Sequence, residues 1–597
     1  MNLNKAQFSF LFIISLLIAY LISGAVLLLL NGYGVKESIS GYKIGLSLQA
    51  MMTNYPRSYE AFLYSFLGTS SIVFMLPLLP QKQKLHGDAR FANQAEIRNK
   101  MNLMEDKGII IGKVGKSLLR YSGDDFVSLA AGTGFGKGVS VVIPNLLEWK
   151  ESAVVMDIKN ENFNITSKYR KEILKQKVYY FNPFEIRTDR YNPLSYVDLD
   201  DPIQRDIQLT DIANMLYPLT GKEESVHFNG LAQSLFIGVC YMYKDINNSS
   251  SGKELMKDIG LEFTFSLAGI LDIQKNISIN YEDKGKNHSI NDFDEIIKYL
   301  DFMGIITSET KRKLSPYLTI QSDREKGSVE SSFIRPLLFF HNEVIRKSTS
   351  HSDFDLRDIR KKRMTIYVAI TPDQLENAKP ILNLFWSQLI SLNTQELPEN
   401  NPDIKYHVLL LMDEFTSIGY MSILHTSVSF IRGYWLRLLI IYQNNSQLEE
   451  NIPRGYGKDG AKTILSNHKC KIYFAQEEVA DAEALSKKLG NKTLRHTNRS
   501  YNSSSKHGGS SSRNINEVKR PLMLPQEIQE INNTKEIITI TTNKPIFCNK
   551  AFYYNDSYFM NKLKKVSPTL NATKGIPSRD QLKKAMQNGE TSIKLKG

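Results

Sequence analysis

A glycine-rich segment in the first third of the chain has the residue types needed to bind phosphate. In the stretch Phe126–Leu147, an apolar run, FVSLAA, leads into a loop with Gly132, Gly134, Gly136 and Lys137, and a second apolar run follows. Glycine lets a phosphate come close to backbone N–H groups, and a lysine adds positive charge beside the β- and γ-phosphates. If the runs are a strand and a helix, the helix N-terminus would also point at the phosphates. A glycine-rich turn without a ligand is the alternative interpretation.

The loop departs from the pattern G-x-x-x-x-G-K-[ST] at two positions. Ala131 stands at the first glycine, and Gly138 stands where a hydroxyl would hold Mg²⁺. Neither Thr133 nor Ser140 can be assumed to replace that hydroxyl, so one Mg²⁺ ligand is left open. The predicted nucleotide-binding residues are Gly132, Thr133, Gly134, Phe135, Gly136, Lys137 and Gly138.

A second apolar run, Tyr406–Glu414, ends in two carboxylates. Asp413 is placed to hold Mg²⁺, through a water molecule, and Glu414 to polarise an attacking water. An apolar strand that ends in Asp-Glu is not specific by itself, because strands often end in acidic loop residues. Together with the glycine-rich loop, and in this order, it predicts a P-loop ATPase that uses ATP and Mg²⁺.

Other polar residues lie next to predicted strands. Gln443 closes the run LRLLIIY, where an amide that senses the γ-phosphate would lie, although a surface glutamine also fits. Asp157, Lys159 and Glu161 lie in VVMDIKNENF, at the end of a predicted strand, and a solvated turn explains them equally well. Arg432 would face outward from a helix end. An outward arginine is usually solvated, but in ring ATPases it can reach the nucleotide of the neighbouring subunit.

The elements that must position these residues follow an α/β pattern beyond residue 81. Short β-rich runs alternate with helical patterns, which favours a mostly parallel sheet wrapped by helices. Between about 200 and 335 helical spacing replaces the β signal, so we predict an inserted all-α domain. Residues 85–199 and 336–560 would then form the nucleotide-binding domain. The predicted strands are 126–131, 153–157, 178–181, 364–370, 407–412, 436–442, 471–475 and 537–541.

The first 84 residues contain two uncharged runs. Residues 8–30 are long enough to cross a hydrocarbon core of ~30 Å at ~1.5 Å per residue, and residues 61–80 form a second candidate span. Basic residues after the second run belong on the cytoplasmic side of a membrane. The sequence therefore predicts a two-helix anchor at 1–84, with a periplasmic loop at 31–60 and a large cytoplasmic part. Buried core helices are the alternative for both runs.

Composition limits the remaining possibilities. A chain of 597 residues is too long for a single hydrophobic core and suggests two or three domains. Its 75 Lys and Arg against 62 Asp and Glu give a basic protein, which suits binding to either nucleic acid or anionic lipid. Residues 561–597 hold eight Lys and one Arg against two acidic residues, and we expect a basic, loosely ordered tail there. The cysteines lie in separate apolar runs, which indicates buried thiols rather than disulfides or zinc ligands. They are Cys240, Cys470 and Cys548.

Eight motifs occur in a fixed order along most of the chain: LHGDARFA (85–92), AGTGFGKGVSVVIPNLL, VVMDIKNENF, YNPLSY (191–196), SHSDFDLRDIR (350–360), TIYVAITPDQL, LLLMDEFTSIG and IIYQNNSQL. This ordered set resembles the type IV secretion coupling proteins, the TraG/VirD group of conjugation ATPases, in which Lys-Gly is a familiar variant of the loop. The resemblance implies two membrane helices, a RecA-like nucleotide-binding domain with an all-α insertion, and a homo-hexameric ring at the bacterial inner membrane. It also implies that Arg432 acts in trans and that Gln443 senses the γ-phosphate.

The resemblance predicts an inner-membrane ATPase that couples recruitment of a substrate to a type IV secretion channel and drives transfer by ATP hydrolysis. Its partners would be the channel subunits, DNA bound without sequence preference, and either a relaxase–DNA complex or effector proteins. An FtsK-type DNA pump is one alternative, but it would carry more spans and a DNA-reading domain, for which we expect too little chain after Tyr558. A nucleotide-binding scaffold with little hydrolysis is the other; Asp413 and Glu414 argue against it, and Gly138 for it.

Overall fold

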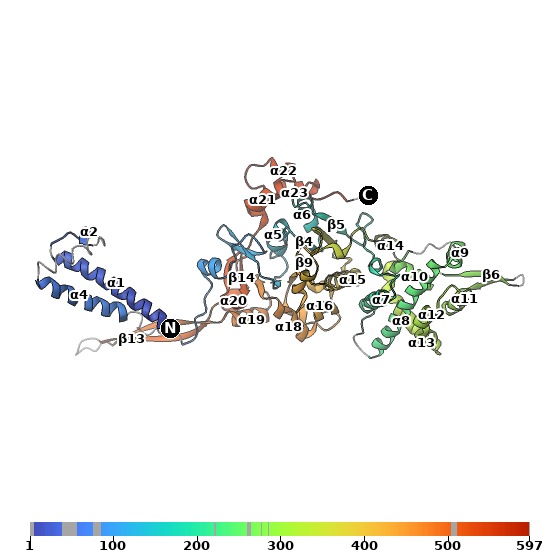
Figure 1. Ribbon diagram of the computed structural model, residues 1–597, viewed down its shortest axis with the longest axis horizontal. Coiled ribbons are helices and arrows are strands. Elements are labelled where there is room, and N and C mark those ends of the chain that lie inside the picture. Colours follow the sequence, from blue (N-terminus) through green and yellow to red (C-terminus); the bar gives the residue numbers. More distant parts are fainter. Residues whose placement is uncertain are drawn as a thin grey trace. The chain divides into compact units, whose positions relative to one another are not determined.

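The computed structural model describes residues 5–30, 32–38, 56–75, 85–219, 223–259, 264–275, 277–283, 286–502 and 510–595. The chain divides into two compact units, residues 1–86 and 87–597. The first unit contains α1 (Lys5–Leu30), α2 (Val35–Ser38) and α4 (Pro56–Met75), and α1 packs against α4 (Figure 1). The helices α1 and α4 overlap the predicted spans 8–30 and 61–80, of which 76–80 lie outside the described residues, and α2 lies in the predicted loop 31–60. Within the described residues, no helix meets the length and apolarity needed to cross a membrane.

An eleven-stranded mixed sheet forms the centre of the second unit, in the order β2-β1-β15-β14-β11-β3-β10-β9-β4-β8-β5. Neighbours from β11 to β5 are parallel, whereas those from β11 to β2 are antiparallel. All predicted strands are present, and three further ones, β1, β2 and β15, extend the sheet. The strands are β1 (Ile109–Val114), β2 (Ser117–Tyr121), β3 (Val127–Ala130), β4 (Ser152–Asp157), β5 (Lys177–Phe181), β8 (Met364–Ala369), β9 (Val408–Met412), β10 (Leu436–Tyr442), β11 (Cys470–Tyr473), β14 (Lys535–Ile540) and β15 (Ile546–Asn549).

Helices cover both faces of the parallel part, which explains why its strands are continuous apolar runs. In β9, Leu410 packs into one core cluster, with residues of α15 (Leu375–Asn393), and Leu411 packs into another, with residues of α5 (Ile143–Glu148) and α6 (Glu161–Glu172). Figure 1 shows α5 and α6 on one side of β4 and β9, and α15 and α16 on the other. The shorter helices here are α16 (Ser422–Ser427), α17 (Asn445–Glu449), α18 (Gly457–Asn467), α19 (Val479–Leu489) and α20 (Pro525–Gln529).

The inserted segment is helical, as predicted, with one exception. The strands β6 (Ile279–Asp283) and β7 (Lys286–Ile290) pair as an antiparallel hairpin, so the prediction of an all-α insertion is wrong there. The hairpin is mostly polar, and its residues therefore lack the apolar alternation that marks a strand. The helices of the inserted segment are α7 (Pro202–Leu216), α8 (Glu223–Asn248), α9 (Ser250–Asp258), α10 (Leu267–Lys275), α11 (Phe293–Phe302), α12 (Ser308–Leu318), α13 (Asp323–Leu337) and α14 (Glu343–Ser348).

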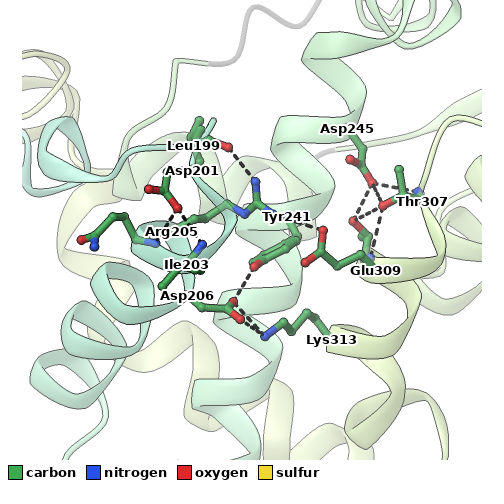
Figure 2. A network of polar contacts seen from close by, with 12 residues as sticks. Leu199, Asp201, Ile203, Arg205, Asp206, Tyr241, Asp245, Thr307, Glu309 and Lys313 are labelled. Atoms are coloured by element: carbon green, nitrogen blue, oxygen red, sulfur yellow. Dashed lines mark hydrogen bonds and ion pairs between the residues drawn. The ribbon is translucent and has the colours of Figure 1, made fainter.

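A polar network joins three helices of the insertion (Figure 2). The guanidinium of Arg205, on α7, lies 4.4 Å from the ring centre of Tyr241 on α8 and 3.1 Å from a carboxylate oxygen of Glu309 on α12. The Tyr241 hydroxyl donates to Asp206, and Lys313 of α12 contacts the same carboxylate at 2.8 Å. Arg205 is only 2% exposed, and a buried charge is tolerated only when it is paired. The network therefore fixes α7, α8 and α12 relative to one another.

The C-terminal residues are folded, so the prediction of a loosely ordered tail is wrong as far as residue 595. Three helices form there: α21 (Ser557–Lys564), α22 (Pro568–Asn571) and α23 (Arg579–Gln587). Phe559, Leu570 and Leu582 are buried with Ile143 of α5 and Tyr169 of α6 in one apolar cluster. The lysine-rich composition does not indicate this packing, because only a few apolar residues in the segment make the core contacts. A long hairpin, β12 (Asn491–Asn502) with β13 (Ser510–Pro521), was also not predicted, because the polar run 502–513 indicates a flexible loop.

Candidate functional site

The glycine-rich loop connects β3 to a helix, as the sequence predicts. A π-helical turn at Gly138–Val142 begins directly after Lys137 and continues into α5. Gly134 and Gly136 have φ of +85° and +82°, a conformation that a side chain would strain. The Ser140 hydroxyl donates to the carbonyl of Gly136 at 2.8 Å. That hydroxyl is therefore engaged within the loop rather than held out as a substitute ligand for Mg²⁺.

Three predicted site residues meet at the carboxyl ends of parallel strands. The Lys137 ammonium contacts Oε1 of Glu414, and Nε2 of Gln443 donates to Oε2 of Glu414 at 3.2 Å. The strands explain this meeting, because β10 pairs in parallel with both β3 and β9. Lys137 follows β3, Glu414 follows β9 and Gln443 follows β10, so the three side chains converge at one edge of the sheet.

Glu414 adopts an unusual backbone conformation for its residue type. Its φ is +59°, in the left-handed region, which costs a residue with a Cβ and persists only where the surroundings impose it. The N–H and the hydroxyl of Ser417 both donate to the Glu414 carbonyl, at 2.9 and 2.6 Å. The carboxylate is thus held at a fixed place between Lys137 and Gln443.

Two aspartates end adjacent strands beside this group. Met156 of β4 pairs with Met412 of β9, so Asp157 and Asp413 follow at neighbouring strand ends. Burial raises the pKa of Asp157 to about 7, although the N–H of Phe163, which donates to its carboxylate at 2.8 Å, opposes that shift. Burial also raises the pKa of Asp413 to about 6, against the opposing charge of Lys137. The sequence allowed a solvated turn at Asp157 equally well, but the structure buries this residue, which is only 1% exposed.

The donors near Asp413 suit a hydrated Mg²⁺ ion. Oδ1 of Asp413 is shielded from solvent and has no hydrogen-bond partner among the described residues. Across the described part of the chain, no three His, Cys, Asp or Glu side chains cluster as a metal site. Mg²⁺ typically keeps several waters and takes only one or two carboxylates plus phosphate oxygens, so a single carboxylate is sufficient here. The assignment of Asp413 as a ligand through water stays a prediction.

A cavity of about 390 Å³ opens beside Glu414 and Gln443. Its wall also holds cationic, amide and acidic side chains, namely Lys379, Arg454, Gln447, Glu376 and Glu450. A volume of this size can take a phosphate group and a water molecule together. A water molecule in this cavity would lie beside the Glu414 carboxylate.

Arg432 lies at the opposite edge of the sheet from Lys137. It belongs to the short helix Ile431–Tyr434 that precedes β10, and its guanidinium contacts the carboxylate of Asp125, which precedes β3. Lys469 contacts the same carboxylate at 3.0 Å. Since the starts and ends of parallel strands lie at opposite edges, the structure does not bring Arg432 to the glycine-rich loop of its own chain. The Arg432 side chain is 49% exposed.

The predicted thiols occupy none of these positions. Cys240, Cys470 and Cys548 are buried and free, which confirms the prediction made from their apolar surroundings. Burial raises the pKa of all three well above the ordinary value for a thiol, so they are unreactive core side chains.

Comparison with known proteins places the chain among secretion proteins. The family model described as "Type IV secretory system Conjugative DNA transfer" matches residues 90–575. Protein VirD4 of Agrobacterium fabrum is 26% identical over 504 residues, which cover 82% of this chain and 69% of that protein. The conjugal transfer protein TraG of Escherichia coli is 26% identical over 523 residues, covering 80% of this chain and 78% of that protein.

Two solved structures share the fold. The plasmid coupling protein TrwB in complex with the non-hydrolysable ATP analogue ADPNP superimposes with a TM-score of 0.54 at 14% identity, covering 79% of this chain and 95% of that one. TrwB in complex with ADP and Mg²⁺ gives a TM-score of 0.53 at 13% identity, with the same coverage of both chains. At this identity the likeness establishes the α/β fold with its mixed central sheet.

Proposed function

Because this chain belongs to the type IV secretory system family of conjugative DNA transfer proteins, we propose that it hydrolyses ATP to drive transfer through a secretion channel. One observation carries the proposal: Lys137, Glu414 and Gln443 converge at the carboxyl edge of a parallel sheet, directly after a glycine-rich loop. That edge is where ligands bind in open α/β folds. TrwB, which shares the fold, has been seen with ADP and Mg²⁺.

The site residues have separate roles in the proposed reaction. The N–H groups of 132–138 and the Lys137 ammonium bind the phosphates, and Lys137 leaves Glu414 as it does so. Glu414 then polarises the attacking water as general base. Gln443, already hydrogen-bonded to Glu414, reports whether a γ-phosphate is present. Asp413 would hold Mg²⁺ through water, and the bound ion would supply positive charge beside the phosphates.

We also propose that the protein works as a homo-hexameric ring with a RecA-like nucleotide-binding domain. Arg432 would then stabilise the transition state at the neighbouring subunit's nucleotide. Its exposure and its place at the sheet edge away from its own Lys137 support a role in trans rather than in cis. An inserted domain at about 200–335 is the proposed place for substrate selection, since it lies outside the nucleotide-binding sheet.

The proposed location is the bacterial inner membrane, with α1 and α4 as anchor and the larger unit in the cytoplasm. The uncharged run 8–30 supports this proposal, and the basic residues after residue 81 support the orientation. The proposed cargo is a relaxase–DNA complex, effector proteins or both. Relatives named conjugal transfer protein TraG favour nucleoprotein, and the net charge of +13 suits DNA.

A second candidate is a nucleotide-binding receptor that hydrolyses ATP poorly. It is favoured by one observation, the lack of a free hydroxyl at the Mg²⁺ position. Gly138 has none, and the Ser140 hydroxyl donates to Gly136. The two candidates differ in what ATP hydrolysis does for transfer, because a receptor needs bound nucleotide only.

A transfer assay tests the proposal in a bacterial host whose transfer depends on this protein. Lys137→Ala should abolish transfer while the amount of protein in the membrane fraction stays unchanged. Lys116→Ala, which removes an exposed lysine from the turn between β1 and β2, is the matched control and should transfer normally. Normal transfer by Lys137→Ala would overturn the assignment of the loop.

A further inference from the structure

A second cavity lies on the other side of the glycine-rich loop from Glu414. Its volume is about 650 Å³, within the range of small-molecule sites. Gly134 and Gly136 form one wall, Phe552 and Tyr554 form another, and Arg579 of α23 closes it. The C-terminal helices, which composition alone marks as a loose tail, therefore build part of a cavity at the phosphate loop.

The sheet order gives the direction in which a bound nucleotide must run. Its γ-phosphate belongs near Glu414 and Gln443, at the ends of β9 and β10, on one side of β3. On the other side of β3 the strands follow in the order β11, β14 and β15. A nucleotide whose γ end lies toward β10 extends its nucleoside end toward β15, and the cavity lies there, because Phe552 and Tyr554 directly follow β15.

A lysine links the wall of this cavity to the loop, because its Nζ donates to Oδ1 of the wall residue Asn533 at 3.2 Å as well as to the loop. Lys550, which follows β15, donates from Nζ to the carbonyl of Phe135 at 2.8 Å and lies 3.5 Å from the ring centre of Phe474. Burial lowers the pKa of Lys550 to about 8. A Cβ on Gly136 would lie only 3.1 Å from the Phe552 ring. The loop and the aromatic wall are therefore held at contact distance.

The closing side chains have the chemistry of a base-binding site. The guanidinium of Arg579 lies 4.4 Å from the ring centre of Tyr554. Among the described residues Arg579 has no carboxylate in ion-pair distance, and the residue is exposed. A planar cation backed by an aromatic ring presents its free face to another flat π-system, and a nucleobase is such a group.

We propose that this cavity binds the nucleoside half of the nucleotide, with the base stacked on the Arg579 guanidinium. The proposal rests on the proposed function, because it assumes that the phosphates occupy the glycine-rich loop. It assigns the C-terminal helix α23 a part in nucleotide affinity. Contact with the base, rather than with the phosphates, is what the cavity adds to the site.

Calorimetric titration of the full-length protein in detergent, with ATP and separately with inorganic tripolyphosphate, tests this proposal. Arg579→Ala should weaken ATP binding roughly tenfold, the size expected for one lost cation–π stack, and leave tripolyphosphate binding unchanged. Lys583→Ala, which removes an exposed charge from the same helix, is the control and should change neither. Arg579→Lys retains the charge without the planar face and should also weaken ATP selectively.

Two results would overturn the proposal. Unchanged ATP affinity in Arg579→Ala would show that no base contacts this side chain. An equal loss for ATP and tripolyphosphate would place Arg579 on the phosphates instead. In both cases the wild-type protein still binds both ligands and Lys137→Ala binds neither, so the proposed function survives. A wild-type protein that binds neither ligand would refute the proposed function and, with it, this inference.

Discussion

The ammonium of Lys137 and the carboxylate of Glu414 form an ion pair, although 277 residues separate them in the sequence. The Lys137 side chain is 15% exposed and that of Glu414 24% exposed, so water only partly screens the pair. In the proposed mechanism, a triphosphate therefore competes with Glu414 for the same ammonium. Nucleotide binding would then release Glu414, the proposed general base, when its substrate arrives.

Gln443 should matter for hydrolysis and little for binding. Gln443→Ala removes the hydrogen bond to Glu414, so ATP affinity should stay near normal while the rate of hydrolysis falls about tenfold or more. Gln447→Ala is the matched control, since Gln447 lines the same cavity but accepts from Thr416 instead. Equal activity of the two variants, measured as phosphate release, would remove Gln443 from the mechanism.

Arg432 should act on the neighbouring subunit. Arg432→Ala should bind ATP nearly normally and lose roughly 10³-fold or more in hydrolysis rate, since an arginine finger acts on the transition state. Mixing it with Lys137→Ala should restore part of the activity, because some interfaces then pair an intact Lys137 with an intact Arg432. Lys469→Ala, which removes the other cation on Asp125, controls for loss of the local ion pair.

Two outcomes separate the alternatives for Arg432. Mixed assemblies without any recovered activity would place Arg432 in cis, contrary to its position at the far edge of the sheet. Normal hydrolysis by Arg432→Ala in assembled rings would mean that the residue is a solvated surface arginine.

Asp157 should make the protein less stable as the pH rises. Its pKa is about 7 in the folded chain against an ordinary 3.8, so the folded state binds more protons between these values. The stabilising contribution of this group is therefore full below about pH 4 and is lost as the pH rises to about 7. Asp157→Asn retains an oxygen that can accept from Phe163 and cannot ionise. The difference in unfolding free energy between the two proteins should grow in favour of the variant from pH 4 to 7. A difference that does not change with pH would show that burial does not raise the pKa of Asp157.

DNA binding by the full-length protein should be sequence-independent and steeply salt-dependent. Neutralising Z phosphates of duplex DNA gives a slope of log affinity against log salt of roughly −0.9Z. Fluorescence anisotropy with two unrelated duplexes should therefore give parallel, falling lines. An affinity that does not change with salt, or no binding at low salt, would favour a cargo made of protein alone.

The sequence predicts the parallel half of the sheet well, because strands buried on both faces are continuous apolar runs. It also places Lys137, Glu414 and Gln443 at strand ends, where the fold brings them together. The antiparallel strands β1, β2 and β15 escape prediction, although β1 pairs with β2 and β15 pairs with β14 across short turns. Only the pairing of β1 with β15 joins segments far apart in the chain.

Contacts across the sheet are the part that sequence reasoning misses. The contact of Asp125 with Arg432 joins residues 307 apart, and no local pattern marks it. That Asp157 and Asp413 lie close together can be predicted only from the strand order, which places β4 beside β9. The folded C-terminal segment is missed for a different reason: its lysines dominate the composition, while a few residues such as Leu570 and Leu582 make the core contacts.

The most direct test of the account is to measure ATP binding and hydrolysis in Glu414→Gln. This change removes the ion pair that competes for Lys137 together with the general base. The Glu414→Gln variant should bind ATP as tightly as the wild-type protein or more tightly, and should hydrolyse it more slowly by roughly 10²-fold or more. Hydrolysis at the wild-type rate in Glu414→Gln, or a wild-type protein that binds ATP without hydrolysing it, would contradict the account.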